Sequence, residues 1–310
     1  MDNLSLFIVS ALLTIITAAT PLVFAALGEL VVEKSGTLNL GVEGMMIVGA
    51  IAAFAAAVTT GSGLLGVLAG AASGALLAAL FALLTLFFMA NQVASGLALT
   101  IFGLGLSALI GHNFVGKSFE GIDNLSIPIL SDLPIIGTLI FGLDPLVYLS
   151  IICAFAIVWF LTKTRAGLIL RAVGENHHAA HAIGHKVVLI RFAAILFGGA
   201  MAGLGGAYLS LIYTPLWAEN MTAGRGWVAL ALVVFAAWRP WRAFFGAYLF
   251  GGIFIIQLYA QGFGLQVPSQ LLSMLPYVIT ILVLVWISAD QSKQSNNAPG
   301  SLGKQFFASS

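Results

Sequence analysis

The sequence has few charged residues and almost no cysteine. Of its 310 residues only 7% are charged, and 12 basic side chains nearly balance 11 acidic ones. A soluble domain carries about a quarter charged residues, so water is not the main solvent of this chain. The balanced charge excludes a nucleic-acid-binding protein, and the high apolar content excludes disorder. The single cysteine, Cys153, excludes a disulfide framework and a cysteine-based metal site.

Apolar residues make up 60% of the chain, and they occur in runs long enough to cross a lipid bilayer. Because lipid requires each backbone polar group to be satisfied within its own segment, these runs predict an all-α, polytopic transmembrane helical bundle. We expect apolar helices at residues 5–27, 40–58, 64–89, 93–112, 145–162, 189–212, 226–238, 243–260 and 274–289. The helix at 226–238 is short for a full crossing, and the segment 28–43 fits a broken or re-entrant piece. The expected count is therefore about 8–10 spans.

Glycines recur at helical spacing in two of these segments. Gly66, Gly70 and Gly74 form one stripe of small residues, and Gly199 and Gly203 form another. Small residues let membrane helices approach closely, so we interpret both stripes as packing surfaces.

Lys and Arg residues gather in three segments, and cytoplasmic loops carry the excess of basic residues in membrane proteins. The loop 163–191, the turn at 239–242 and the tail 290–310 are therefore assigned to the cytoplasmic side, and the tail is expected to be disordered. The loop 113–144 is acidic and is assigned to the external side. An odd number of spans then places the N-terminus outside, and the membrane domain extends over residues 1–289.

Residues 111–118 (GHNFVGKS) match the phosphate-loop pattern GxxxxGK[ST]. That pattern cradles phosphate only between a strand and a helix, whereas here an apolar helix precedes it and an acidic loop follows. We interpret the match as coincidence. The sequence also lacks a GxSxG nucleophile motif and a pair of intramembrane aspartates, so we predict no enzyme and no cofactor held by this chain.

The loop 171–185 is the least membrane-like stretch between two spans. It favours a short helix after Glu175 and Asn176, with Gly184 placed to end it. His177, His181 and His185 recur every four residues, which is a spacing that can bind a transition metal. No cysteine or helical carboxylate accompanies them, and a break at Gly184 separates the last from the others. A solvated docking helix is therefore preferred over a metal site.

A few polar residues lie near the ends of the predicted helices. A carboxylate at membrane depth usually faces a cavity or a partner, so Glu43 either lines a pathway or lies in water at the cytoplasmic interface. Glu29 and Glu33 are expected at that interface. The candidates for a translocation pathway are Asn39, Glu43, Asn91, Gln92 and Ser95.

Arg225 is expected to begin a helix on the external side, beside Glu219. Both residues are placed there to contact a docked binding protein, or Arg225 only pairs with Glu219.

Three stretches together resemble the permease subunits of bacterial ABC importers, in the superfamily of branched-chain amino acid and ribose permeases, and a fourth agrees with them. Residues 33–46 (EKSGTLNLGVEGMM) are similar to the signature E[RK]SGxxNxGxEGxM after the first helix. Residues 171–184 resemble the cytoplasmic pattern RAxGENxxAAxxxG. Residues 127–137 (IPILSDLPIIG) resemble the external IPxLxxIPxxG loop, and 217–231 (WAENMTAGRGWVALA) is also similar to the family. The nucleoside-type branch, which works with basic-membrane-lipoprotein-like binding proteins, is the one the chain resembles most.

This resemblance implies two permease subunits, identical or different, with ATP bound by separate ATPase subunits and an extracytoplasmic substrate-binding lipoprotein. It implies a bacterial inner-membrane location and transport of a nucleoside or a related compound. By the same resemblance, the loop that couples to the ATPase contains Arg171, Gly174, Glu175, Asn176, Ala179, Ala180 and Gly184.

Other functions also fit the residues. An ABC importer of simple sugars or branched-chain amino acids differs from the preferred reading only in substrate. An ion-coupled secondary transporter needs intramembrane carboxylates, for which Glu43 is the only candidate. A membrane scaffold that binds metal through the histidine loop is the third alternative.

Overall fold

The computed structural model describes residues 3–125, 137–262 and 298–307, together with scattered residues between 268 and 285. This part of the chain contains helices and no β-strand, with one isolated bridge between Ser118 and Leu216. The long helices are α1 (Asn3–Lys34), α2 (Val42–Thr60), α3 (Gly63–Ala82), α4 (Gln92–Gly111), α5 (Pro145–Lys163), α8 (Val187–Tyr208) and α10 (Pro240–Gly262). The shorter elements are η1 (Leu83–Phe87), η2 (His112–Phe114), η3 (Gly137–Phe141), α6 (Arg165–Glu175), α7 (His177–Ala182), η4 (Leu209–Tyr213) and α9 (Arg225–Phe235). The all-α fold class is confirmed.

Seven of the described helices are long and apolar enough to cross a membrane, and α9 is too short. These eight correspond to the first eight helices that the sequence predicts, and the ninth, at 274–289, lies mostly outside the described residues. The first helix extends to Lys34 rather than ending at residue 27, because Glu29 and Glu33 are buried against other segments instead of lying in water. Only residues 35–41 of the predicted broken segment are irregular, and most of them are buried.

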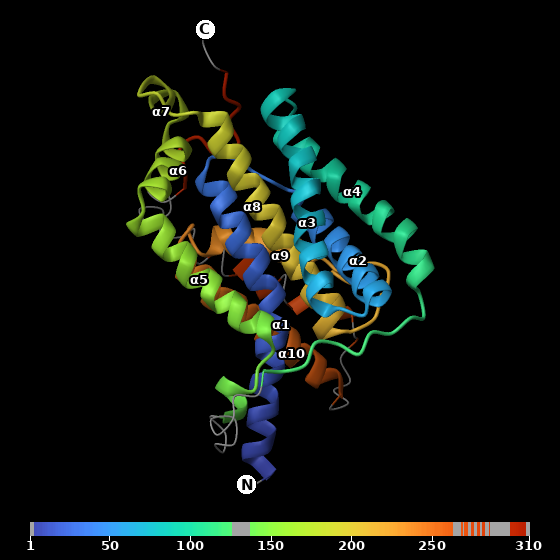
Figure 1. Ribbon diagram of the computed structural model, residues 1–310. Coiled ribbons are helices and arrows are strands. Elements are labelled where there is room, and N and C mark those ends of the chain that lie inside the picture. Colours follow the sequence, from blue (N-terminus) through green and yellow to red (C-terminus); the bar gives the residue numbers. More distant parts are fainter. Residues whose placement is uncertain are drawn as a thin grey trace.

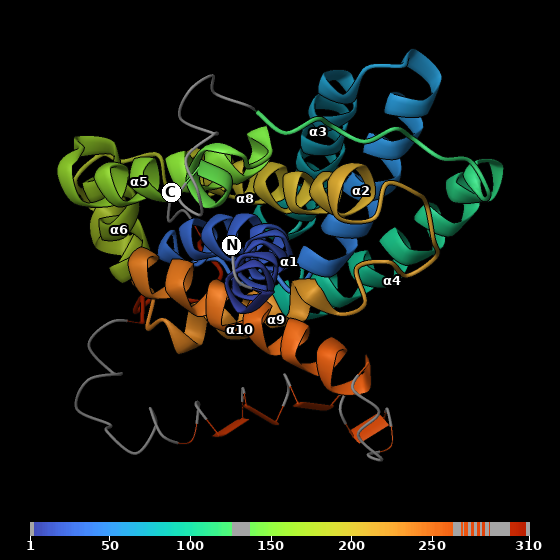
Figure 2. The ribbon, with the colours of Figure 1, turned by 90° about the horizontal axis from the view of Figure 1, so that it is seen from below.

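Helix α8 lies at the centre of the bundle and packs against α1, α2 and α3. Seen along the bundle, α1 and α8 are surrounded by α5 and α6 on one side and by α2 to α4 on the other (Figure 2). The two predicted glycine stripes face each other, since a β-carbon on Gly203 would overlap the carbonyl of Gly70 and one on Gly74 would overlap that of Gly199. Their role as packing surfaces is therefore confirmed.

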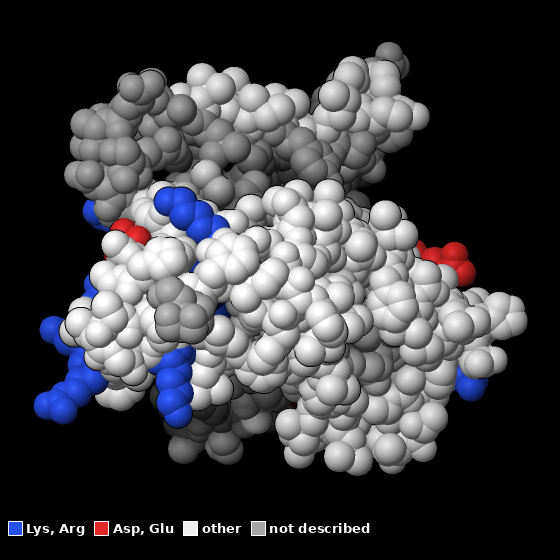
Figure 3. All heavy atoms as spheres, turned by 90° about the horizontal axis from the view of Figure 1, so that it is seen from above, with Lys and Arg blue, Asp and Glu red and all other residues white. Residues whose placement is uncertain are grey.

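The two ends of the bundle differ in the segments that they carry. Helices α6 and α7 and residues 298–307 lie at one end, which we call the α6–α7 end, and the N-terminus lies at the other (Figure 1). Basic side chains lie mostly over the part of the α6–α7 end that carries these two helices (Figure 3). The predicted basic turn lies at this end too, since the ring N–H of Trp238, directly before Arg239, donates to Oε2 of Glu33 near the end of α1. The basic segments thus share one end, as the sequence predicts.

The tail departs from the prediction of disorder. Residues 298–307 fold back onto the α6–α7 end, where Ser301 and Phe306 are almost completely buried. The backbone N–H of Ser301 donates to the carbonyl oxygen of Gly174, and that of Gly303 donates to the carbonyl oxygen of Gly36. The prediction was wrong for this segment because its polar and glycine-rich composition conceals contacts made far away in the sequence.

Candidate functional site

The loop between α5 and α8 contains two short helices with regular caps. The Thr164 hydroxyl accepts from the N–H of Gly167 at the start of α6, and the Asn176 side chain accepts from the N–H of Ala179 at the start of α7. Gly184 follows α7 with a φ of +92°, a conformation that glycine adopts without strain. The predicted helix after Asn176 and its end at Gly184 are confirmed.

This loop is held tightly against the end of α1. A β-carbon on Gly174 would overlap the carbonyl oxygen of Lys34, so only glycine allows this approach of the two backbones. Ala180 is buried, whereas Glu175, Asn176 and Ala179 are exposed. The loop thus has one face fixed to the bundle and another that faces outward.

Ile183 is a large apolar side chain at the tip of the outward face, where it is 73% exposed. Its place directly before Gly184, where α7 ends, is the one local signal in the sequence for this exposure.

Arg191, near the start of α8, joins three segments of the α6–α7 end. Its completely buried guanidinium donates from Nε to the Ser35 carbonyl (3.1 Å) and from Nη1 to the Lys304 carbonyl (2.9 Å). Its Nη2 lies 3.1 Å from Nδ1 of His177. Because guanidinium is only a donor, that nitrogen of His177 must be unprotonated. In the sequence, Arg191 is only one of the basic residues of the loop 163–191, since nothing local identifies acceptors so far away in the chain.

Glu43 joins two helix N-termini inside the bundle. Its Oε1 accepts from the Thr222 hydroxyl (2.6 Å) and from the N–H of Gly224 (2.9 Å), and its Oε2 accepts from the N–H of Gly226 (2.6 Å). The neighbouring Gly44 packs against the backbone near the middle of α4, so this junction lies deep within the bundle. Glu43 is only 3% exposed, so it does not lie in water at an interface. Its carboxylate satisfies backbone donors that α9 leaves free by starting inside the protein.

The irregular segment 35–41 lies between the α1 end and this junction. The N–H of Leu38 donates to Oε1 of Gln92 (2.8 Å), and the N–H of Asn39 donates to Oε1 of Glu29 (3.2 Å). The side chain of Asn39 accepts from the N–H of Gly41. Side chains from α1 and α4 thus replace the backbone partners that a continuous helix would supply.

The other predicted pathway residues lie close to this segment on α4. Ser95 is buried, and Asn91 is exposed and caps α4 by accepting from the N–H of Ala94. Three buried atoms near residues 37–39 have no hydrogen-bond partner in the described part of the chain, namely Oε2 of Glu29, Oγ1 of Thr37 and Nε2 of Gln92. Unpartnered buried polar atoms are costly, so this segment has hydrogen-bonding capacity that a rearrangement or a bound solute could satisfy.

Arg225 starts α9 beside the Glu43 junction, further inside than the sequence predicts. Its guanidinium donates to the carbonyls of Met221 and Thr222 and lies over the rings of Tyr213 and Phe254. Glu219 is exposed.

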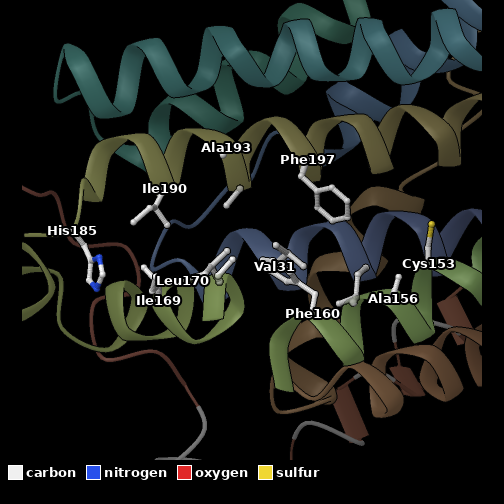
Figure 4. A pocket seen from close by; sticks show the side chains of 13 residues that line it. Val31, Cys153, Ala156, Phe160, Ile169, Leu170, His185, Ile190, Ala193 and Phe197 are labelled. Carbon is white, nitrogen blue, oxygen red and sulfur yellow. The ribbon is translucent and has the colours of Figure 1, made fainter. Parts of the chain in front are cut away.

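An apolar cavity of about 580 Å³ lies between α1, α5, α6 and α8 (Figure 4). Val31, Phe160, Leu170 and Phe197 contribute to its wall, and His185 faces into it from the α6–α7 end. This apolar lining does not suit a polar solute.

The histidines of the loop do not form a common site. His177 contacts Arg191, His181 packs against the ring of Phe306, and His185 faces the apolar cavity. Among the described residues, no group of three or more His, Cys, Asp or Glu side chains is placed to hold a metal ion.

The phosphate-loop match at 111–118 lies at the end of α4 and continues through the 3-10 turn η2. A β-carbon on Gly111 would overlap the ring of Trp217. Because α4 precedes the match, a helix stands where phosphate binding requires a strand. The external motif at 127–137 lies outside the described residues except for Gly137.

Comparison with known proteins gives consistent results. Residues 11–284 match the family described as the branched-chain amino acid transport system permease component. The chain is 40% identical to a putative glucose ABC transporter permease of Haloferax volcanii, over 87% of this chain and 88% of the relative. It is 34% identical to a nucleoside ABC transporter permease of Lactococcus lactis (86% and 88%) and 32% identical to a guanosine ABC transporter permease of Bacillus subtilis (98% and 100%). No solved structure matches the chain.

The Glu43 junction predicts a loss of stability when the carboxylate is replaced. In Glu43→Gln an amide NH₂ faces a backbone or hydroxyl donor, so we expect the free energy of unfolding to fall by about 1–3 kcal/mol. Thermal unfolding of the purified protein in detergent measures this, with Glu219→Gln at an exposed position as the control. Equal melting of Glu43→Gln and the parent protein would contradict the role of the carboxylate.

The contact between His177 and Arg191 predicts a pH dependence. Burial, and then the charges of Arg191, His178 and Lys304, lower the pKa of His177 from 6.5 to about 4. Between these two values the unfolded chain binds a proton that the folded protein excludes, so this contribution to stability falls as the pH drops from 6.5 to about 4.

We expect His177→Gln, which keeps an acceptor but does not titrate, to lose less stability than the parent protein over this pH range. Melting temperatures measured at a series of pH values test this, with the exposed His112→Gln as the control. Parallel curves for His177→Gln and the parent would show that His177 does not titrate in this way.

Proposed function

We propose that this chain, which belongs to the permease-component family of branched-chain amino acid transport systems and is the permease of an ABC transporter, imports a nucleoside. The protein is a multi-pass membrane protein and a transport subunit rather than an enzyme. Membership of the family implies an ATPase subunit and a substrate-binding partner. We also propose a coupling loop, a pathway for the solute and the make-up of the complete importer.

The observation that carries the coupling role is the pair of faces on the α6–α7 loop. The outward face presents Glu175, Asn176, Ala179 and Ile183, where the ATPase docks. The inner face is fixed to the end of α1 through Gly174, so a push on the loop moves α1 and the segment 35–41. Rigid-body displacement of packed helices is an established route to alternating access.

The pathway follows the segment 35–41 toward the Glu43 junction. Asn39, Gln92 and Ser95 line it, and the unpartnered atoms of Glu29, Thr37 and Gln92 give it the capacity to bind a polar solute. Asn91 marks its opening at the α6–α7 end. Glu43 contributes through the position of α9, since both of its oxygens already accept hydrogen bonds.

The complete importer contains two permeases, identical or different, in the bacterial inner membrane, with the α6–α7 end in the cytoplasm. The opposite end receives an extracytoplasmic lipoprotein that delivers the solute. The exposed Glu219 contributes to that docking surface. Arg225 fixes the turn next to it by donating hydrogen bonds to the carbonyls of Met221 and Thr222.

Two relatives named for nucleoside or guanosine transport support the nucleoside, and each matches most of this chain. Glucose is the second candidate, because a relative with higher identity is named for it. Ion-coupled secondary transport is disfavoured, since Glu43 is occupied by three hydrogen bonds.

A charge reversal tests the coupling loop. We expect Glu175→Arg to lower ATP-driven uptake by about tenfold, because the new cation changes the outward face that the ATPase contacts and removes the carboxylate that accepts from the N–H of Gly300. Uptake into vesicles and ATP hydrolysis are measured together, with Glu175→Asp, which keeps the negative charge, as the control. Normal uptake by Glu175→Arg at normal expression would remove the loop from the mechanism.

Competition tests the substrate. Uptake of labelled guanosine by cells that express the complete importer is expected to be inhibited by other nucleosides and unaffected by glucose, because only nucleosides offer a base to the binding partner. Importer-dependent uptake of labelled glucose, with no uptake of guanosine, would assign the sugar instead.

A further inference from the structure

Residues 298–307, which we call the clip, make hydrogen bonds to the coupling loop. Ser301 donates from its backbone N–H to the Gly174 carbonyl (2.8 Å) and from its hydroxyl to the Glu175 carbonyl (3.2 Å). The same hydroxyl accepts from the N–H of His177 (3.3 Å). Ser301 thus binds the junction between α6 and α7, where the chain changes direction.

The clip also binds two other parts of the α6–α7 end. The N–H of Gly303 donates to the carbonyl of Gly36, in the turn that follows α1. The side chain of Gln305 donates to the carbonyls of Met89 and Ala90, in the turn between η1 and α4. One segment of ten residues therefore connects the coupling loop with the start of the segment 35–41 and with the start of α4.

Phe306 anchors the clip under α7. It is only 5% exposed and contacts the rings of His177, His178 and His181. Helix α7 has six residues, and a helix of this length is not stable in water without packing contacts. The ring of Phe306 supplies part of the apolar support that α7 needs.

We propose that the clip makes the coupling loop, the turn at 35–36 and the turn at 89–90 move as one unit when the ATPase pushes on α6 and α7. Ser301 and Phe306 are the positioning residues, and Arg191 reinforces the unit by binding the Ser35 and Lys304 carbonyls and His177. The inference rests on the proposed coupling role of the α6–α7 loop. It adds that force reaches α1 and α4 together because the clip connects them.

The test uses the complete importer in vesicles and compares two neighbouring phenylalanines. Phe306→Ala removes the buried ring, whereas Phe307→Ala changes a ring that is 60% exposed. We expect Phe306→Ala to lower the solute transported per ATP hydrolysed by about tenfold, with assembly and solute binding by the partner unchanged. Phe307→Ala is expected to keep the normal ratio, and Phe306→Tyr to restore most of it. A normal ratio in assembled Phe306→Ala overturns the proposal.

A cross-link keeps the test decisive where Phe306→Ala fails to assemble. The pair Ala90→Cys and Gln305→Cys, in a Cys153→Ser background, joins the clip to the α4 turn through a short bis-maleimide. Because the clip moves with its neighbours, the cross-linked importer is expected to transport normally. Loss of uptake on cross-linking, with ATP hydrolysis retained, would show that the clip must detach and would overturn the proposal.

The result for Glu175→Arg separates this inference from the proposed function. Normal uptake by Glu175→Arg rejects the coupling role of the loop. Uncoupling by Glu175→Arg together with a normal ratio in Phe306→Ala rejects the clip alone.

Discussion

The arrangement of this bundle depends on the hydrogen bonds that Glu43 accepts from the start of α9. A helix that begins inside a membrane protein leaves backbone N–H groups without partners, and lipid supplies none. Glu43 satisfies two of these groups together with the Thr222 hydroxyl. The same contact holds the N-termini of α2 and α9 together, so the short helix α9 begins against a full-length helix inside the bundle.

From this junction a continuous series of contacts extends to the α6–α7 end. The segment 35–41 is bound by Glu29 and Gln92, and its first residues contact Gly174 and Arg191. Close backbone packing at Gly174 transmits displacement well because packed backbones have no room to yield. The α6–α7 loop and the interior junction are therefore linked through the segment 35–41, which contacts both.

The glycine-rich packing of α8 supports this arrangement. Gly199 and Gly203 let α8 lie directly against α3, and Gly206 lets it lie against α2 at Met46. Lipid provides no hydrophobic driving force between helices, so the van der Waals contacts made at such close approach are a main source of attraction between them. The rigid centre gives the irregular segments a fixed frame, and it separates the apolar cavity beside α5 from the polar residues beside α4.

The sequence by itself determined the features that depend on local hydrophobicity and on the properties of single residues. Long apolar runs located the membrane helices, the glycine stripes identified a packing surface, and Asn176 and Gly184 marked the limits of α7. Basic residues also placed the loop, the turn and the tail at one end. The tertiary structure alone decided that Glu43 caps α9, that Arg191 joins three segments and that residues 298–307 are ordered. The physical reason is that a buried polar group is stabilised by whichever partner the fold brings to it, and here those partners come from segments far apart in the chain.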